Sequence, residues 1–445
     1  MLKRIKVENF KSLKHLDYKC AKLNLLTGLN GAGKSSFIQL LCLLREIAPR
    51  ASEQSVTLTS IGRHGEISYQ DAHYCYSKMP DTRFEVAFSS RESEQEFLLK
   101  KVINPCSIHG GLVVSHPDYS WEQFNAYAEL DEARLADING KKPIGDMDAI
   151  EQKCDEEFCA WLNRIQSEEK DAVAVFKEVW KGARFIDAFR KKPCDVNRGG
   201  AYHDLNFMFE GYDVAEFDPE GGDVWEFLYK GKELCRDDSL LEKVNECLQW
   251  VSPGAWLEVD QKKVGEEEYY IKAVAFGKDS ANAFKPQNVG FGISYILPVL
   301  VTLLTAKSGS IIIIENPEAH LHPRGQAEVG KLIAETVGRG VQVFVETHSD
   351  HVINGIRVSV KKGLVKPEDV NIAFFERKAH DVKNENETFV SNDGVKHVKK
   401  GVGSHQEIYA EVRNIKIDGN GSLSEYPTDF MDEWNIQQMK LFRLK

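Results

Sequence analysis

The chain has 445 residues, and its 57 Lys and Arg against 68 Asp and Glu give a formal net charge of −11, which disfavours general electrostatic attraction to nucleic acid. DNA binding would therefore need a local basic patch. No apolar run approaches the roughly 18 to 20 residues that cross a membrane, and the beginning MLKRIKVENF lacks the apolar segment of a secretory signal.

The first hundred residues predict strands of a sheet together with one amphipathic helix. Apolar residues alternate along the first strand, and a short apolar run precedes the helix, whose apolar residues follow helical spacing. The predicted strands are 2–9, 23–26, 84–88 and 97–103, and the predicted helix is 36–46. From 104 to 145 the chain is rich in Gly, Pro, Asp and Asn, which predicts a looped insert.

The middle of the chain alternates between helical and loop-rich segments. Residues 148–181 carry apolar positions at helical spacing, which predicts one or two helices that are far too short for a long coiled-coil arm. Residues 190–223 predict loops, and 239–250 predict a helix. A hairpin is expected from 256–260 and 269–276.

The apolar density rises in the C-terminal third, where helices alternate with short buried strands. The predicted helices are 293–304 and 326–337, and the predicted strands are 311–314, 341–345 and 370–375. This alternation is typical of an α/β fold with parallel strands, so we expect the loop after 23–26 and the acidic residue after 311–314 to lie on neighbouring strands. The tail from about 380 predicts a small appendage of short strands and turns.

The segment GLNGAGKS, Gly28 to Ser35, is the strongest motif in the sequence. It has the Gly-x-x-x-x-Gly-Lys-Ser spacing of a phosphate-binding loop, between a predicted strand and a predicted helix. Such a loop points backbone N–H groups and a helix N-terminus at an anion. Lys34 would reach the β- and γ-phosphates, and the Ser35 hydroxyl would bind Mg²⁺.

Three further segments place polar groups where a nucleotide site needs them. The strand of IIIIENPEAHLHP ends in Glu315, whose carboxylate can hold Mg²⁺ directly or through water. The segment VFVETHSDH, 343–351, is a buried strand that ends in a polar cluster, expected at the same sheet edge. The segment NVGFGISY, 288–295, is a glycine-rich loop ahead of a helix and thus a second candidate anion site.

Together these motifs resemble the ATP-binding cassette (ABC) ATPases of the structural-maintenance-of-chromosomes (SMC) type, and more closely the OLD-like (overcoming lysogenization defect) bacterial AAA/ABC-type ATPases. NFKSLKHL, 9–16, is similar to the N-terminal motif of that class, and GSLSEYPTDFMDEW, 421–434, to the C-terminal module of one subgroup. The resemblance is good over 1–75 and 285–378, loose over 185–280 and the tail, and nearly absent over 104–180.

The resemblance implies a role for individual residues. Glu315 is the Walker B acid, and His348 senses the γ-phosphate. The residues that would contact nucleotide are Lys11, Ser12, Asn30, Gly31, Ala32, Gly33, Lys34, Ser35 and Ser36 in one chain, with Gly290, Gly292 and Ser294 acting on the ATP of a second chain and His322 in the D-loop. Ser35, Glu315 and Gln70 are the candidate Mg²⁺ contacts, and an ordinary surface residue is the competing interpretation for Gln70.

One position departs from the resemblance. Asn316 stands where the catalytic glutamate of the cassette pattern belongs, and an amide cannot act as a general base. Two interpretations remain open. Either Glu318, two residues later, polarises the attacking water, which we favour, or the ATPase is slow and switch-like.

Weaker signals have ordinary explanations. The histidines at 320, 322, 348 and 351 already have nucleotide-site explanations, so a dedicated metal site is not expected. The basic patches at 189–193 and 397–401 are expected to be solvent-exposed surface, and contact with nucleotide or DNA is the alternative interpretation. The nine cysteines include no C-x-x-C pair, which disfavours a disulfide framework or a zinc site and favours a cytoplasmic protein.

The resemblance implies an ABC/SMC-type P-loop ATPase head interrupted by an insertion. Its expected parts are 1–103 and 236–378 for the two halves of the head, 104–235 for a helical and loop-rich insertion, and 379–445 for a small α+β module. We expect an ATPase that uses ATP and Mg²⁺, dimerises head to tail and serves as sensor or regulator beside a separate nuclease or toxin, as in anti-phage defence. The alternatives are a DNA-repair or chromosome-maintenance ATPase and an ATP-binding scaffold with little turnover. No Asp-x-Asp pair follows His351, so we do not expect nuclease activity.

Overall fold

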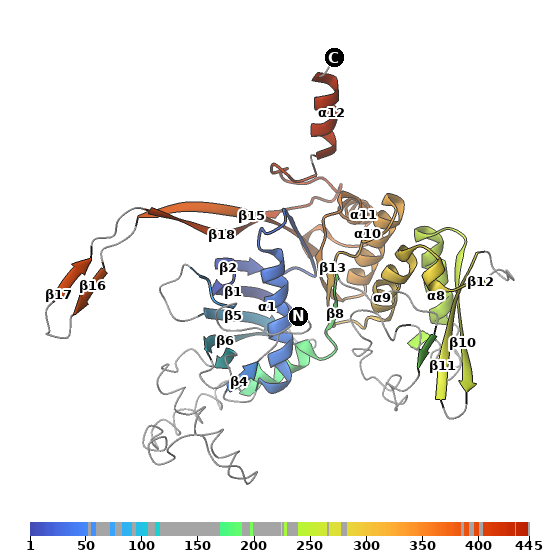
Figure 1. The fold of residues 1–445 in the computed structure, drawn as a ribbon, viewed down its shortest axis with the longest axis horizontal. Coiled ribbons are helices and arrows are strands. Elements are labelled where there is room, and N and C mark those ends of the chain that lie inside the picture. Colours follow the sequence, from blue (N-terminus) through green and yellow to red (C-terminus); the bar gives the residue numbers. More distant parts are fainter. Residues whose placement is uncertain are drawn as a thin grey trace, which may run out of the picture.

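The fold is described from a computed structural model. It describes residues 1–51, 55–58, 72–75, 82–90, 95–105, 112–115, 170–188, 196–198, 224, 227–228, 239–264, 267–276, 283–383, 387–390, 396–399, 404–431 and 433–443. Two six-stranded sheets dominate this part of the chain, and helices lie on both sides of the second (Figure 1). Among the described helices, none is long and apolar enough to cross a membrane.

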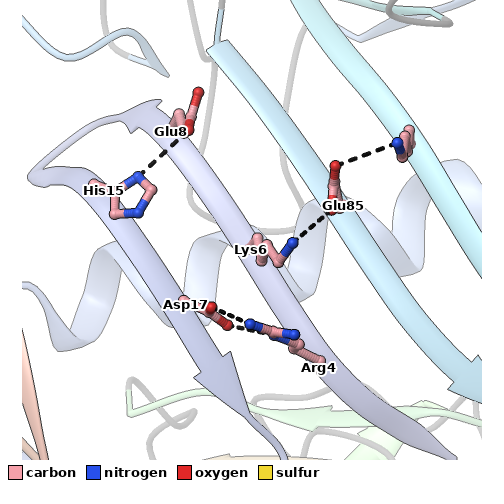
Figure 2. Close-up of polar contacts among 7 residues, drawn as sticks. Arg4, Lys6, Glu8, His15, Asp17 and Glu85 are labelled. Atoms are coloured by element: carbon pink, nitrogen blue, oxygen red, sulfur yellow. Dashed lines mark hydrogen bonds and ion pairs between the residues drawn. The ribbon is translucent and has the colours of Figure 1, made fainter.

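The first sheet is built from the N-terminal part of the chain. Its strands in spatial order are β2 (Leu13–Lys19), β1 (Leu2–Phe10), β5 (Thr82–Ser89), β6 (Glu96–Pro105), β7 (Leu112–Ser115) and β4 (Ser55–Leu58), and all neighbours are antiparallel. Alternation along β1 buries Ile5 and Val7 on one face. The opposite face carries exposed cross-strand pairs such as Lys6 with Glu85, 3.0 Å apart (Figure 2). Exposed pairs of this kind contribute little to stability, so the buried face holds this sheet in place.

The second sheet carries the candidate site. Its order is β18 (Ser404–Ile415), β15 (Val370–Lys383), β3 (Leu23–Gly28), β14 (Gln342–Glu346), β13 (Ile311–Glu315) and β8 (Arg184–Ile186). The five strands from β15 to β8 are parallel, and β18 is antiparallel to β15. Every residue of β3, β13 and β14 is buried, as expected for strands covered on both faces.

The strand order corrects one prediction. β14 lies between β3 and β13, so the phosphate-loop strand and the strand that ends in Glu315 are not neighbours. The pattern of alternating strands and helices predicts parallel pairing, but it does not determine which strands become adjacent. The helix α10 (Pro323–Gly338) returns the chain so that β14 pairs with β13 on one side and with β3 on the other.

Two hydrophobic cores lie on opposite faces of this second sheet. Ile311, Ile313 and Phe344 share one core with the helix α1 (Lys34–Ile47), which lies between the two sheets. The intervening residues Ile312 and Ile314 face the other core. That core is covered by α8 (Ser239–Val251), α9 (Phe291–Thr305), α10 and α11 (Asp350–Lys361). By the same alternation, Glu315 and Glu346, which follow Ile313 and Phe344 by two residues, point toward α1.

A four-stranded sheet packs beside α8. Its strands are β10 (Ala255–Val264), β11 (Glu267–Phe276), β12 (Ala283–Phe284) and β9 (Val196–Arg198), and β10 pairs antiparallel with β11. Asn245 of α8 accepts a hydrogen bond from the backbone N–H of Leu257 at 2.7 Å, which attaches the helix to this sheet. The predicted hairpin and the predicted helix over 239–250 are therefore confirmed.

The C-terminal part differs most from its prediction. The strand predicted over 370–375 continues to Lys383, and β18 pairs with it along twelve residues, so the two form a long ribbon that extends from the second sheet (Figure 1). The outer half of this ribbon is polar and half-exposed, which hides it from an apolar-pattern search. Ion pairs between its strands, such as Arg413 with Glu376 at 3.2 Å, supplement the backbone pairing. A hairpin of β16 (Glu387–Val390) and β17 (Lys396–Lys399) and the helix α12 (Glu433–Arg443) complete this region.

The remaining differences are local. Strand β2 was not predicted, because its Lys, His and Asp residues mask the alternation. Strands β7 and β9 lie in segments predicted to be loops. The described residues 170–180 are helical, as predicted. Short 3₁₀ turns occur at Ala48–Arg50, Pro286–Asn288 and Pro367–Asp369. Gln70, residues 148–169 and the patch at 189–193 lie outside the described residues.

Candidate functional site

The phosphate-loop segment connects the end of β3 to the start of α1. Gly28, Gly31 and Gly33 have φ values of 130°, 74° and 112°, in the left-handed region that glycine adopts without strain. Gly33 is the N-cap of α1, and no side chain there accepts the hydrogen bonds of the first helical N–H groups. These groups and the helix dipole are thus directed at the space above the loop, the arrangement that binds an anion.

Two of these glycines touch the ribbon of β15 and β18. A Cβ atom on Gly28 would lie 2.2 Å from the carbonyl oxygen of Phe375 in β15, and one on Gly33 would lie 2.5 Å from the Cβ of Ala410 in β18. Both distances are shorter than real Cβ contacts. A Cβ on Gly31 would meet nothing within 4 Å. Glycine is needed at 28 and 33 for two reasons: the backbone has a positive φ there, and the strands of the ribbon pack too closely for a side chain.

Lys34 is the buried cation of the loop. Its Nζ donates to the carbonyl oxygens of Gly28 at 2.8 Å and Leu29 at 2.9 Å, and it lies 3.8 Å from Oε1 of Glu346. Burial lowers the pKa of Lys34, and Glu346 acts in the opposite direction. The ammonium group is therefore held over the loop by three oxygen atoms at 3.8 Å or less.

The predicted N-terminal motif lies against the first turn of α1. The Oγ atoms of Ser12 and Ser36 are 2.8 Å apart, and Lys11, at φ 51°, forms the turn between β1 and β2. The structure thus brings Ser12 and Ser36 together beside the loop, whereas the backbone N–H of Lys11 donates to the carbonyl of Ala72 at 2.8 Å. The exposed members of the predicted set are Asn30, Gly31 and Ser35, whereas Ala32 is buried.

Carboxylates gather at the carboxyl ends of three neighbouring parallel strands. Glu315 and Glu346 are paired in register, both are buried, and both point toward α1 by the strand alternation. Oε2 of Glu315 accepts a hydrogen bond from the backbone N–H of Ala188 at 3.3 Å. The buried Asp187 directly follows β8. Among the described residues, no three His, Cys, Asp or Glu side chains lie close enough to form a metal cage.

This donor set fits the way Mg²⁺ is used with nucleotides. Mg²⁺ is usually held by one or two carboxylates together with substrate phosphates, not by a cage made of protein alone. A buried carboxylate at Glu315 and an exposed hydroxyl at Ser35 match that requirement. Gln70 lies outside the described residues, so its proposed contact stays a prediction.

Glu318 reaches across to residues 347–351 after β14, here called the switch segment. Its Oε1 accepts a hydrogen bond from the backbone N–H of His348 at 2.9 Å. Burial raises the pKa of Glu346, and the charge of Glu318 adds to that rise. Burial lowers the pKa of His348, with a contribution from Lys34 in the same direction. Lys34, Glu346, Glu318 and His348 therefore interact electrostatically as one group, here called the switch cluster.

Asn316 forms the turn that makes this reach possible. Its φ is 44°, its backbone N–H donates to the carbonyl of Glu346 at 2.9 Å, and its carbonyl accepts from Ala319 at 3.1 Å. A left-handed backbone is several-fold commoner for Asn than for most residues. The residue that departs from the cassette pattern thus has a conformational reason to be Asn.

The glycine-rich segment 288–295, here called the signature loop, packs on other residues of its own chain. Gly290 is the N-cap of α9, and a Cβ on Gly292 would lie 2.7 Å from the carbonyl oxygen of His320. The rings of Tyr295 and His320 pack edge to face at 4.6 Å. Oγ of Ser294 is buried and has no hydrogen-bond partner among the described residues. The structure therefore groups the signature loop with the residues after β13 that include His320 and His322, here called the D-loop.

His322 has a structural contact in the same region. It is the N-cap of α10, and its Nδ1 accepts a hydrogen bond from the backbone N–H of Arg324 at 3.3 Å. The imidazole itself is exposed. Within the described residues, no hydrogen bond or ion pair connects Gly290, Gly292 or Ser294 to the phosphate loop.

Sequence reasoning missed three residues next to the phosphate loop or the Walker B strand. Glu346 had a usable signal, because VFVE repeats the pattern of IIIIE, a buried strand that ends in a carboxylate. Asp187 follows a strand of only three residues, too short to be recognised. Ala410 lies almost 380 residues after Gly33, and nothing in its local sequence indicates the contact.

The comparisons with known families cover the later part of the chain. Residues 209–354 match the family described as "AAA domain, putative AbiEii toxin, Type IV TA system". This match includes the signature loop, β13 and β14 but not the phosphate loop. Residues 400–441 match a family described as "Protein of unknown function (DUF3696)". No curated protein matches the chain.

Similar solved structures are SMC heads. They include the SmcHead bound to the C-winged helix domain of ScpA, at 12% identity and TM-score 0.44, covering 91% of this chain and 97% of that chain. They also include the Smc head domain with an extended coiled coil bound to the C-terminal domain of ScpA from Pyrococcus furiosus, at 11% identity and TM-score 0.43, covering 99% of each chain. The SMC head domain from Thermotoga maritima has 9% identity and a TM-score of 0.35, covering 90% and 99%. At these scores the likeness carries no argument about function. The described part of the chain is an α/β protein with a largely parallel sheet flanked by helices, and residues 209–354 are similar to an AAA domain.

Proposed function

We propose that this protein binds and hydrolyses ATP at the phosphate loop. The observation that carries the proposal is the switch cluster, in which the Lys34 ammonium lies over the loop and within 3.8 Å of Glu346, while Glu318 contacts His348. Backbone N–H groups at the start of α1 and the Lys34 ammonium suit the negative charge of the β- and γ-phosphates. Ser12 and Ser36 would hold the neighbouring turn in position.

Ser35 and Glu315 are the residues that would hold Mg²⁺. When bound, Mg²⁺ neutralises charge on the phosphates. The chain itself would supply the remaining positioning: Ala188 orients the Glu315 carboxylate through its backbone N–H, and Asn316 turns the chain so that Glu318 faces the switch segment. Gln70 stays a candidate Mg²⁺ contact.

Glu318 would act as the general base that takes a proton from the attacking water. A carboxylate can perform this role, whereas the amide of Asn316 cannot. The contact between Glu318 and His348 supports this assignment, because it places the carboxylate beside the residue expected to sense the γ-phosphate. The competing assignment is a slow, switch-like ATP-binding protein, and turnover measurements distinguish the two.

The signature loop would complete the site of a second chain. Gly290, Gly292, Ser294 and the D-loop residue His322 have no hydrogen bond to their own phosphate loop in the described residues, and a glycine-rich helix start can donate hydrogen bonds to a phosphate. Two copies would therefore enclose two ATP molecules head to tail.

The wider role is that of a cytoplasmic sensor or regulator whose partner performs the effector chemistry. Like the OLD-like ATPases it resembles, the chain would work beside a separate nuclease or toxin in anti-phage defence. The sequence of 104–235 carries none of the nucleotide-site motifs, and the outer half of the β15–β18 ribbon extends past the body of the protein (Figure 1). Segments outside a conserved scaffold commonly carry partner surfaces. We expect no nuclease activity from the chain itself. A DNA-repair role is the second candidate, and stimulation of turnover by DNA would favour it.

The deciding experiment measures ATP binding and turnover by the purified full chain with Mg²⁺. Calorimetry with a slowly hydrolysed ATP analogue gives the affinity, and phosphate release gives the turnover. Binding with turnover supports the ATPase, whereas binding without turnover supports the scaffold. If the wild-type protein binds no nucleotide, the proposed function is wrong.

A further inference from the structure

The base of the ribbon β15–β18 forms the wall behind the phosphate loop. Gly28 abuts the backbone of Phe375 in β15, and Gly33 abuts the side chain of Ala410 in β18. The two contacts involve both strands of one ribbon and both ends of one loop. Phe375 is also paired in register with Gly28, so the loop begins where the ribbon leaves the parallel sheet.

Additional contacts fix β18 to the turn between β1 and β2. The backbone N–H of Ala410 donates to the carbonyl of Ser12 at 2.8 Å, and Ser12 in turn contacts Ser36 of α1. Glu407 pairs with Lys14 at 2.8 Å and accepts a hydrogen bond from Tyr74 at 3.1 Å. Glu407 is buried, and these partners hold its pKa below the ordinary value against the effect of burial.

The other end of the ribbon lies far from these contacts. Strands β15 and β18 remain paired from Ile372 with Ile415 to Lys383 with Ser404, and the outer half extends past the body of the protein (Figure 1). The outer ribbon is joined to Ala410 by a continuous backbone ladder, from the pair of Lys383 with Ser404 to the pair of Arg377 with Ala410. Residues 400–441, which match a family of unknown function, include β18 and Ala410.

We infer that Ala410 is a positioning residue for the phosphate loop, and that the C-terminal ribbon regulates nucleotide binding through it. A displacement of the outer ribbon would shift β18 against Gly33, and closure of the loop on phosphates would fix β18 in return. Such coupling is reciprocal: a partner that binds the outer ribbon changes ATP affinity, and ATP changes the affinity for that partner by the same factor. This inference rests on the proposed ATP binding.

The first test is substitution of Ala410. Ala410→Val adds two carbons on a Cβ that faces Gly33, and we expect ATP-analogue affinity to fall about tenfold, the scale of a modest overpacking cost. Ala410→Gly removes the side chain that faces Gly33 without adding a clash, and we expect a smaller loss of affinity than in Ala410→Val. The matched control is Ala379→Val, which makes the same change at an exposed position of the same ribbon. Thermal unfolding of each variant shows whether it folds.

The second test uses the unmodified protein and so does not depend on a variant folding. Hydrogen exchange is measured with and without the ATP analogue. We expect slower exchange in 404–412 with the analogue and no change in the second half of α8, 245–251. If the wild-type chain binds no analogue, the proposed function fails. If it binds, but Ala410→Val matches Ala379→Val and exchange in 404–412 is unchanged, the ribbon inference alone is overturned.

Discussion

The phosphate loop and the signature loop are both glycine-rich segments ahead of a helix, but their surroundings differ. Gly28 and Gly33 are enclosed by the ribbon, and Lys34 is held by two carbonyls and a carboxylate. At the signature loop, Phe291 is 51% exposed, and Oγ of Ser294 has no partner among the described residues. A buried hydroxyl without a partner is costly, whereas the Lys34 ammonium has three oxygen atoms around it within its own chain.

This difference separates what one chain can do from what requires two. The phosphate-loop end contains cation, carboxylates and backbone donors within one chain, so binding and base catalysis should depend on residues of that chain. Among the described residues, the signature-loop end packs on the D-loop at His320 and has no hydrogen bond to its own phosphate loop, so its contribution should appear only when a second copy is present.

Glu318→Gln should lower turnover by about 10² while ATP still binds, since a general base contributes typically 10²- to 10⁴-fold. Gln preserves the size of the side chain and retains an acceptor oxygen for the N–H of His348. Phosphate release and calorimetry measure the two effects separately. Asn316→Gly is the comparison variant, because glycine adopts the φ of 44° freely and removes only the amide side chain. A larger loss from Asn316→Gly would show that the base has been misassigned.

Lys34→Ala should weaken ATP binding at least about tenfold, or roughly 1.4 kcal/mol. The ammonium is the cation nearest to the loop carbonyls and should contact the phosphates directly. Calorimetry measures the affinity, with Lys22→Ala as the control, since Lys22 pairs with Asp369 at the other end of β3. Unchanged affinity in Lys34→Ala would contradict the phosphate-loop assignment.

The sequence predicted the phosphate-loop end better than its surroundings for a physical reason. The motif from Gly28 to Ser35 is local: strand, loop and helix are set by adjacent residues, and β3 and α1 were found within a few residues of their predicted bounds. The runs before Glu315 and Glu346 were recognisable because strands covered on both faces must be apolar throughout.

Long-range pairing is where the prediction failed. The position of β14 between β3 and β13 depends on crossover packing, and the contact of Ala410 with Gly33 depends on a polar ribbon that returns from the end of the chain. In the ribbon, backbone hydrogen bonds and ion pairs replace the apolar alternation that sequence patterns detect. The roles of Ser294 and His322 stay predictions, because they would contact the ATP bound by a second chain and a single chain cannot show that contact.

Ser294→Arg should block ATP-dependent association without preventing binding at Lys34. Light scattering detects the association, and mixing variants tests the shared site. In a mixed dimer, the Lys34→Ala chain supplies an intact signature loop and the Ser294→Arg chain an intact phosphate loop. Random mixing should restore about a quarter of wild-type turnover, because half of the dimers are mixed and each has one complete site of two. No recovery on mixing, with ATP-induced association unchanged in Ser294→Arg, would refute the two-chain division.

Glu346→Gln should have the smallest effect of these variants. The direction in which its unfolding free energy changes with pH tests whether the phosphate-loop end carries a costly buried charge. Burial raises the folded-state pKa of Glu346, so its contribution to stability is complete below the ordinary carboxyl pKa and is lost as pH rises through the raised value. The unfolding free energy of Glu346→Gln relative to wild type should therefore increase as pH rises from about 4.5 toward neutrality. Glu85→Gln is the opposite control: Lys6 lowers the pKa of Glu85, so the wild-type carboxylate stabilises at higher pH, and this variant should lose stability relative to wild type as pH rises from acid. Urea unfolding from pH 3.5 to 7 measures both curves. If the stability difference between Glu346→Gln and wild type does not change with pH, the Lys34–Glu346 pair fully offsets the burial of the carboxylate. The phosphate loop and the signature loop would then differ in packing and not in the cost of a buried charge.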